Sequence, residues 1–321
     1  MIYLIATIVL TALILLYFRI ADHFNIIDKP NERSSHTSVT IRGGGVIFPL
    51  AAVFWFVWEG WQYPYFMAGL ILISVISLAD DILTLKALPR FLVHLLAVTA
   101  MLYNSAVASM DWYYVLIGVI LVIGWINAFN FMDGINGITA FYALVAILSF
   151  LWVNNEIHIY STSLLGVITI SLLIFSFFNV RKKARTFAGD VGSVSLAFIL
   201  AFLMIQLILY TEHIEFILFF AVYGIDSALT ILRRLSLGQN IFRAHRSHLY
   251  QFMANEMQMG HIKVSAIYAI SQSIINTLII LNFINGWLPS GTFLAAGLLI
   301  MVLIYVGARG YIIRQISLQS S

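Results

Sequence analysis

The sequence contains no cysteine, and only 10% of its 321 residues are charged. The absence of cysteine excludes disulfide bonds, thiol nucleophiles and cysteine-ligated metal sites. Soluble domains carry about 25% charged residues, so the low charge excludes an ordinary soluble protein. The formal net charge of +3 is small and lies between apolar runs, which argues against nucleic-acid binding.

Apolar residues are in excess: they make up 61% of the chain and give a mean hydropathy of +0.96. Because a bilayer core is crossed by about 20 apolar residues per helix, we expect an all-α polytopic membrane protein with about 10–11 transmembrane helices. The whole chain, 1–321, is expected to form one integral-membrane domain, with an uncleaved first span. The expected spans lie near 1–20, 43–60, 64–80, 90–105, 113–129, 137–153, 160–178, 193–211, 213–232, 263–284 and 288–308.

All 17 lysine and arginine residues fall on one side of these spans. The positive-inside rule makes that side cytoplasmic, with the N-terminus periplasmic and the C-terminus cytoplasmic. The cytoplasmic loops are expected near 21–42, 81–90, 130–136, 179–192 and 233–262. Carboxylates and glycines gather in the same loops, so we expect a charged, water-soluble substrate to bind on this face.

Two adjacent carboxylates, Asp80 and Asp81, end the third expected span at its cytoplasmic side. Acidic residues close to hydrocarbon are costly and tend to be functional, and a helix C-terminus disfavours anions. A bound cation would offset both effects. The pair is therefore a candidate metal or phosphate site, and the alternative is a solvated helix end.

A polar segment with almost no spacer joins the fifth and sixth expected spans. It contains Asn130, Asp133 and Asn136 among glycines. Such a kink can present backbone N–H groups to a phosphate at a helix N-terminus. The alternative is a tight helix–helix turn, because Asp-Gly and Asn-Gly are common turn dipeptides.

A second glycine-bearing segment, 187–193, precedes the eighth expected span. It places an aromatic ring, Phe187, and a carboxylate, Asp190, at the start of a helix. The glycines would let the backbone approach a ligand closely. The alternative is a simple helix cap.

Three further features lie on or near the same face. Arg42 is followed by three glycines, which fits either a phosphate approach or a flexible loop. His245, Arg246 and His248 form a basic segment that favours anion binding over zinc, with a polar surface loop as the alternative. Asp226 lies inside the ninth expected span and is either functional or a partnered structural acid.

These segments, in this order, resemble the polyprenyl-phosphate N-acetylhexosamine-1-phosphate transferase superfamily, glycosyltransferase family 4. The resemblance runs nearly the whole chain and rests on the segments 33–36, 42–45, 80–81, 130–134, 189–193 and 244–248 together with Asp226. The histidine segment is similar to that of the branch that initiates O-antigen synthesis. It lacks the consecutive histidines typical of the branch that uses a muramoyl-pentapeptide.

The resemblance implies a reaction in which undecaprenyl phosphate attacks the β-phosphorus of a UDP-N-acetylhexosamine, such as UDP-N-acetylglucosamine. UMP leaves, and a lipid-linked O-antigen or related cell-envelope glycan is begun. The implied cofactor is Mg²⁺, with Mn²⁺ as a substitute. The implied location is the bacterial inner membrane, with a cytoplasmic active site, and a homodimer is compatible with the resemblance.

The resemblance also implies roles for single residues. The catalytic residues would be Asp80, Asp81, Asp133 and Asp190, with Asp190, Asp80 and Asp81 at the metal. The substrate-binding residues would be Arg42, Asn130, Asn136, Phe187, Asp226, His245, Arg246 and His248. Phe187 would stack on uracil. Many relatives carry an acid where this chain has Asn136, so we assign this amide to recognition of the uracil edge.

Three other functions agree less well with these residues. A transporter of an anionic solute would fit Asp226, but the polar residues gather at one face and not at the midplane. A CDP-alcohol phosphotransferase would need further acids along the span 137–153, which has none. A lipid-binding scaffold would tolerate loss of Asp190.

Overall fold

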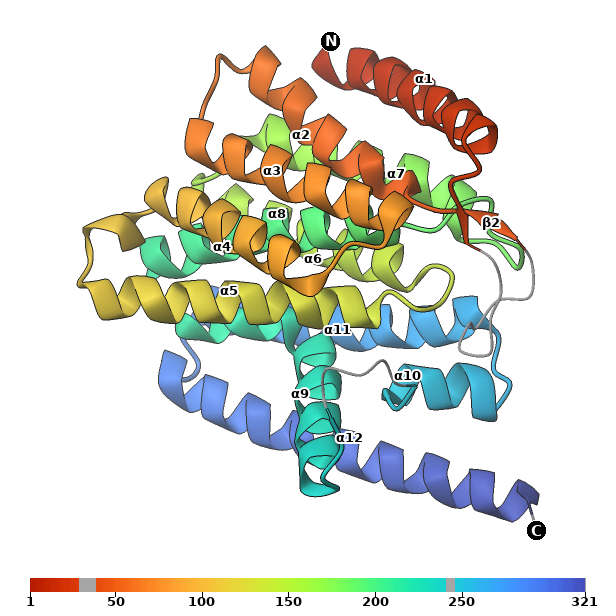
Figure 1. Cartoon of the computed structure of the whole chain (residues 1–321). Helices are drawn as coiled ribbons and strands as arrows, with labels where there is room; N and C mark the ends of the chain where they lie inside the picture. Colours follow the sequence, from red (N-terminus) through yellow and green to blue (C-terminus); the bar gives the residue numbers. More distant parts are fainter. Residues whose placement is uncertain (29–38, 241–245, 321) are drawn as a thin grey trace.

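The computed structural model describes residues 1–28, 39–240 and 246–320. Most of the long helices run roughly alongside one another (Figure 1). They are α1 (Ile2–His23), α3 (Pro64–Leu83), α5 (Trp112–Met132), α6 (Ile138–Ile157), α7 (Thr162–Asn179), α8 (Gly189–Thr211), α11 (His261–Asn285) and α12 (Ser290–Ser320). The shorter elements are β1 (Ile27–Asp28), β2 (Thr40–Ile41), η1 (Gly44–Val46), α2 (Ile47–Trp58), α4 (Ala87–Tyr103), η2 (Ala106–Ser109), η3 (Ile214–Phe220), α9 (Ala221–Ser236), α10 (Leu249–Gln251) and the π-helical turn η4 (Phe252–Glu256).

The expected membrane class is confirmed. In the described ranges nine helices are long and apolar enough to cross a bilayer, counting Ile214–Ser236 as one, and Gly44–Trp58 and Ala87–Tyr103 are shorter apolar helices. Together they coincide with the expected spans. Several boundaries differ by a few residues, among them the start of α8 at Gly189, and the largest difference is at the C-terminus, where α12 continues to Ser320. The sidedness of the termini stays a prediction.

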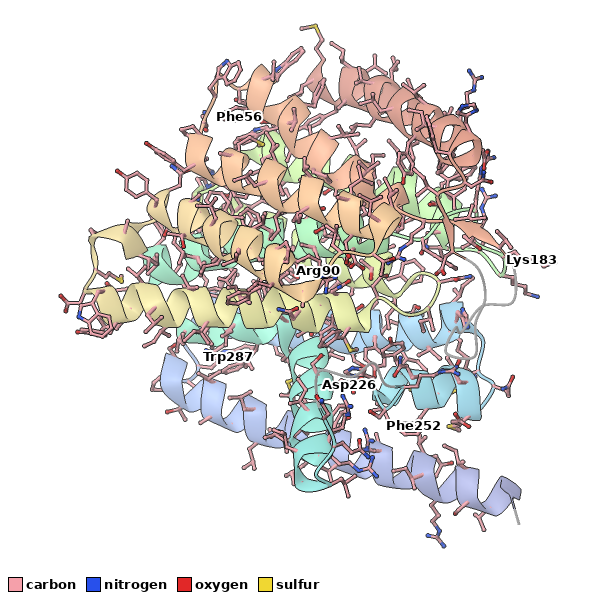
Figure 2. All side chains as sticks on the ribbon, viewed as in Figure 1. Phe56, Arg90, Lys183, Asp226, Phe252 and Trp287 are labelled. Atoms are coloured by element: carbon pink, nitrogen blue, oxygen red, sulfur yellow. The ribbon has the colours of Figure 1, made fainter. Side chains whose placement is uncertain are left out.

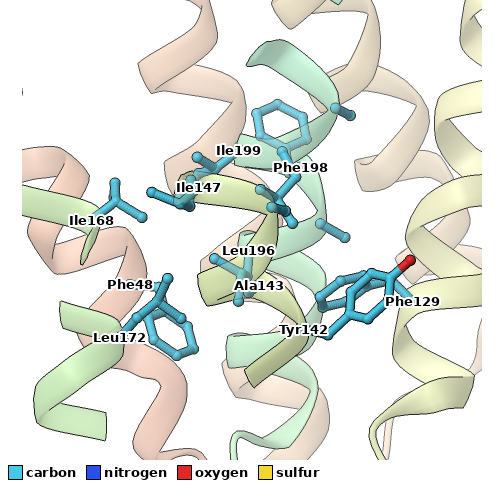
Figure 3. Packing of buried hydrophobic residues seen from close by; sticks show 14 of the residues in the cluster. Phe48, Phe129, Tyr142, Ala143, Ile147, Ile168, Leu172, Leu196, Phe198 and Ile199 are labelled. Atoms are coloured by element: carbon cyan, nitrogen blue, oxygen red, sulfur yellow. The ribbon is translucent and has the colours of Figure 1, made fainter. Parts of the chain in front are cut away.

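Helix α8 is the most deeply buried of the long helices. Of its most apolar window, 83% is buried inside the protein, against 6% for α12. Figure 3 shows side chains from several helices meeting around α8, with Ile168 and Leu172 of α7 on one side and Phe129 of α5 on the other. Any residue in the first turn of α8 is therefore held by the most deeply packed element.

Hydrogen-bonded polar groups lie within the apolar interior at the point where η3 ends and α9 begins. The amide of Gln272 on α11 accepts from the N–H of Val222 (2.9 Å) and the hydroxyl of Tyr142 (2.7 Å). It donates to the carbonyl of Leu218 (2.8 Å) and to Asn276 (2.7 Å). These bonds satisfy backbone groups near the junction of the two helices. Beyond it, α9 runs steeply across the direction of the other helices (Figure 1).

A two-stranded ribbon, which the sequence did not predict, ties two loops together. Strands β1 and β2 pair in an antiparallel register, Ile27 with Ile41 and Asp28 with Thr40. Ile41 also forms a parallel bridge with Thr186, and its carbonyl accepts from the N–H of Phe187 (2.9 Å). The α1–α2 connection is therefore fastened to the segment that leads into α8.

Candidate active site

The first turn of α8 is packed directly against the glycine turn before α2. The N–H of Gly45 donates to the carbonyl of Ala188 (3.1 Å). A Cβ on Gly45 would lie only 2.3 Å from the Cα of Gly192, so the two backbones can touch only without side chains. Gly43 and Gly189 both have positive φ, +82° and +71°, which glycine adopts most easily. This contact places Arg42 beside the N-terminus of α8.

Asp81 is held at that helix N-terminus. Its carboxylate accepts from the backbone N–H groups of Asp190 (2.9 Å) and Val191 (3.0 Å). The same carboxylate lies 2.7 Å from Nε of Arg42, and its side chain is 0% exposed. Free N–H groups at a helix N-terminus favour an anion, so α3 and α8 are joined through a buried carboxylate.

Asp80 faces the other way, toward the start of α4. Its carboxylate accepts from the N–H of Leu85 (2.6 Å) and is paired with the guanidinium of Arg90. Nη1 of Arg90 is also 3.5 Å from Oδ2 of Asp190, and Nη2 of Arg42 is 3.6 Å from Oδ1 of Asp190. Figure 2 labels Arg90, which lies in the first turn of α4.

The result is an alternating cluster of three carboxylates and two guanidinium groups around Asp190. Arg90, Arg42 and the α8 N-terminus compensate the charges of Asp80 and Asp81, and the bound cation that we expected at the end of α3 stays a prediction. Burial opposes the charge of Arg42, but the carboxylates of Asp81 and Asp190 outweigh it and raise the pKa of Arg42. With all groups ionised, one negative charge is left over.

A pocket of about 320 Å³ opens beside this cluster and is polar on most of its wall. Its lining comes from the connections α1–α2, α5–α6, α7–α8 and α9–α11, together with the adjoining helix ends. The lining residues are Asp28, Arg42, Asn130, Asp133, Gly134, Ile135, Asn136, Asn179, Phe187, Gly189, Asp190, Gln251 and His261. Six of the residues expected from the sequence therefore share one cavity: Arg42, Asn130, Asp133, Asn136, Phe187 and Asp190.

Asp133 and Asn130 are fixed by hydroxyl groups of neighbouring helices. Thr139 donates to Oδ1 of Asp133 (2.6 Å), and Ser193 donates to Oδ1 of Asn130 (2.6 Å). Burial, and to a smaller extent the charge of Asp81, raises the pKa of Asp133 to about 6, although the Thr139 hydrogen bond opposes the shift. Asp133 therefore changes its charge close to neutral pH.

Asn136 has only one end of its amide satisfied. Its Nδ2 donates to the carbonyls of Arg181 (2.7 Å) and Lys182 (3.4 Å). Its Oδ1 is buried and has no hydrogen-bond partner in the described part of the chain, and the residue is 4% exposed and lines the pocket. Because the amino group is bonded to backbone carbonyls, the Oδ1 atom is available to accept a hydrogen bond from a ligand.

Asp226 and His248 lie apart from the pocket lining. The carboxylate of Asp226 accepts from the N–H of Leu249 (3.0 Å) and from the hydroxyls of Tyr268 (2.7 Å) and Tyr305 (3.0 Å). Nδ1 of His248 is 3.5 Å from the same carboxylate. Figure 2 shows Asp226 on α9. Arg246 begins the described part of this loop, and His245 lies outside the described residues.

Residues 63–208 match glycosyl transferase family 4. These residues form a glycosyl transferase family 4 domain, and the named relatives support the polyprenyl-phosphate N-acetylhexosamine-1-phosphate transferase superfamily. A probable undecaprenyl-phosphate N-acetylglucosaminyl 1-phosphate transferase of Bacillus subtilis is 25% identical over 84% of this chain and 81% of its own length.

Two other relatives bear different names. An undecaprenyl-phosphate alpha-N-acetylglucosaminyl 1-phosphate transferase of Yersinia pestis is 24% identical over 88% of this chain and 84% of its own length. A phospho-N-acetylmuramoyl-pentapeptide-transferase of Thermotoga neapolitana is 25% identical over 74% of this chain and 83% of its own length. Their names differ in the group that is transferred.

The donors of this family 4 site fit a hard divalent cation. Mg²⁺ is usually held by one or two carboxylates, with phosphates and waters completing its shell. Asp133, in the α5–α6 connection, and Asp190, in the first turn of α8, line the pocket, and Asp28 is the third carboxylate of its lining. No group of three or more histidine or acidic side chains in the described ranges is arranged as a complete metal site. A substrate diphosphate would have to supply the remaining ligands.

Sequence reasoning missed several residues of the site. Arg90 was counted only as a topology signal, although it pairs with Asp80. Thr139, Gln251 and His261 carry no signal in a single sequence, because helices distant along the chain bring them here. Arg90 could have been found, since it is a charge ten residues from Asp80 at the start of an apolar helix.

Proposed function

We propose that this membrane protein transfers N-acetylhexosamine-1-phosphate from a UDP-sugar to undecaprenyl phosphate. The observation that carries the proposal is the pocket in which Arg42 and Asp190 meet Phe187 and Asn136 in a chain of glycosyl transferase family 4. The product would begin a lipid-linked glycan, such as an O-antigen or a related cell-envelope polymer. The 17 basic residues support a cytoplasmic site in the bacterial inner membrane.

The proposed step is a phosphoryl transfer. An oxygen of the lipid phosphate forms a bond to the β-phosphorus of the UDP-sugar, and the bond from that phosphorus to the bridging oxygen breaks. The electron pair leaves with UMP, and the sugar phosphate stays on the lipid as a diphosphate. Catalysis of such a reaction consists mainly of positioning and neutralisation of charge. The long acceptor chain explains why the site lies at the end of an apolar bundle.

The uridine end is assigned to the wall formed by Phe187 and Asn136. An aromatic face can stack on a base, and the unpartnered Oδ1 of Asn136 can accept the N–H of a uracil ring. The Nδ2 bonds to the carbonyls of Arg181 and Lys182 keep this oxygen from exchanging places with the amino group. The assignment therefore uses a buried acceptor that has no donor among the residues that the structure describes.

The phosphate end is assigned to the cluster around Asp190. Arg42 and Arg90 flank this carboxylate and would bind phosphate oxygens, while Asp80 and Asp81 hold both guanidinium groups in place. Asp190, with Asp133, would hold Mg²⁺, which supplies charge neutralisation for the diphosphate when bound. The lipid phosphate is already anionic near neutral pH, so its attack depends little on a general base that removes a proton.

The alternative is a transporter of an anionic solute. Its main support was Asp226, an acid inside a span. That carboxylate is occupied by a backbone N–H and two tyrosine hydroxyls, so it has little capacity left for a transported ion. The polar pocket also lies at the end of the bundle, where the helix connections meet.

The experiment is UMP release by purified protein with undecaprenyl phosphate, Mg²⁺ and a panel of UDP-N-acetylhexosamines that includes the muramoyl-pentapeptide donor. We expect lipid-dependent UMP release with an N-acetylhexosamine, and its loss in Asp190→Asn. Glu156→Gln removes an exposed charge distant in sequence from the pocket segments and is the matched control. Folded wild-type protein that releases no UMP with any donor would reject the proposal, and release only with the muramoyl-pentapeptide donor would reject the sugar.

A further inference from the structure

Arg309 is a buried cation on the least buried long helix. Only 6% of the most apolar window of α12 is buried, yet Arg309 is 8% exposed. Its Nη1 donates to the carbonyl of Ser247 (3.1 Å) and to the hydroxyl of Tyr305 (2.9 Å), and its guanidinium lies 5.1 Å from the ring centre of Phe252. Its Nε and Nη2 have no hydrogen-bond partner among the described residues.

A buried guanidinium with unpartnered nitrogens is not expected to stabilise the folded protein. Burying a charge without a directly bonded carboxylate is costly, and replacement of such groups by apolar ones is often neutral or stabilising. Tyr305 connects Arg309 to Asp226, since its hydroxyl lies 3.0 Å from Oδ1 of that carboxylate. Arg309 and Asp226 thus hold two consecutive parts of one segment, the carbonyl of Ser247 and the N–H of Leu249.

This segment leads directly into the pocket wall. The hydroxyl of Tyr250 donates to the carbonyl of Phe131 (3.1 Å), and its ring leaves no room for a side chain on Gly134. Gln251, the next residue, lines the pocket, and its side chain accepts from the N–H of His248 (3.2 Å). A shift of the carbonyl of Ser247 would therefore move Tyr250 and Gln251 relative to the α5–α6 connection.

We infer that α12 acts as a positioning element: Arg309, through Ser247 and Tyr305, holds the segment 246–251 against the wall of the substrate pocket. Arg309 does not line the pocket and is a positioning residue only. Figure 2 shows Phe252, the residue that follows this segment, on the same side of the protein as Asp226 and α12. The effect on kinetics rests on the proposed function, whereas the effect on the order of the segment does not.

The test compares Arg309→Gln and Tyr305→Phe with Arg314→Gln, which removes an exposed charge from the same helix. Hydrogen–deuterium exchange on the full-length protein in detergent gives the first readout. We expect exchange over 247–251 to rise about tenfold in Arg309→Gln, as loss of one hydrogen bond to a charged donor implies, and to stay unchanged in Arg314→Gln. Exchange in α3 and α8 should not change.

UMP-release kinetics give the second readout. We expect the KM for the UDP-sugar to rise about tenfold in Arg309→Gln, with kcat and the KM for undecaprenyl phosphate within about twofold, and Arg309→Lys to recover part of the loss. If Arg309→Gln does not fold, Tyr305→Phe, which removes one hydroxyl, carries the same expectations at smaller size.

The two readouts separate the two ideas. A wild-type protein that releases no UMP defeats the proposed function, and exchange over 247–251 still decides the positioning role. Unchanged exchange over 247–251 in folded Arg309→Gln and Tyr305→Phe overturns the inference. So does a rise of equal size in every helix, because that pattern is loss of global stability and not release of one segment.

Discussion

Gly45→Ala tests the backbone contact that places Arg42 beside Asp190. The added Cβ would lie 2.3 Å from the Cα of Gly192 and 2.8 Å from the carbonyl oxygen of Ala188. Both obstacles are backbone atoms, so no rotamer change can relieve the clash. From 2.3 Å to the 3.4 Å at which ordinary van der Waals contact begins, the backbones must separate by about 1.1 Å.

That displacement acts directly on the reacting groups. Gly45 lies three residues from Arg42, and Gly192 lies two residues from Asp190. A misplacement of about 1 Å in an active site can cost about 100-fold in rate. We expect kcat/KM for UMP release to fall about 100-fold, with a stability loss of about 1–3 kcal/mol from overpacking.

The assay is lipid-dependent UMP release together with thermal unfolding of the same preparations. Gly124→Ala is the control, because a Cβ at this position on α5 has no atom within 4 Å. Wild-type activity in Gly45→Ala would refute the argument that this backbone contact sets the distance between Arg42 and Asp190.

Two further changes probe the charges of the site. Because the pKa of Asp133 is raised from 3.8 to about 6, the folded state binds this proton more tightly than the unfolded state. The free energy of unfolding therefore falls by at most about 3 kcal/mol as the pH rises from about 4 through 6. We expect the melting temperature to fall over this pH range in the wild type and to fall less in Asp133→Asn. A wild-type slope in Asp133→Asn would exclude this carboxyl as its source. Arg90→Gln leaves Asp80 without its guanidinium, so we expect UMP release to fall at least tenfold, a loss of about 1.4 kcal/mol. Lys86→Gln, at an exposed residue that caps the same helix, should have near wild-type rates, and equal loss in both variants would point to general surface charge.

Much of the architecture was predictable because the bilayer imposes a simple rule on sequence. Apolar runs of helical length locate the spans, and the structure places helices at all of them. The site was predictable to the extent that its residues follow the ends of these spans. Asp133 and Phe187 lie in helix connections and Asp190 lies in the first turn of α8, and the long apolar helices bring all three to the same end of the bundle.

What could not be predicted depends on contacts between helices. Asp226 reads from the sequence as either functional or structural, and only the hydroxyls of Tyr268 and Tyr305, from two later helices, place it in a buried network. Arg309 reads as an ordinary cytoplasmic charge at the end of a span. The early start of α8 was missed because Gly189 and Gly192 lower helix propensity, whereas burial and Asp81 at its N-terminus compensate.

The amide of Gln272 has a consequence for how the protein is built in the bilayer. A chain can depart from a regular helix at membrane depth only where other protein groups replace the missing hydrogen bonds. Gln272 satisfies the carbonyl of Leu218 and the N–H of Val222, and it is itself held by Tyr142 of α6. Until α6 and α11 have associated, the turn into α9 would leave polar groups facing lipid. We therefore expect α6 and α11 to associate in the membrane before α9 packs across the other helices.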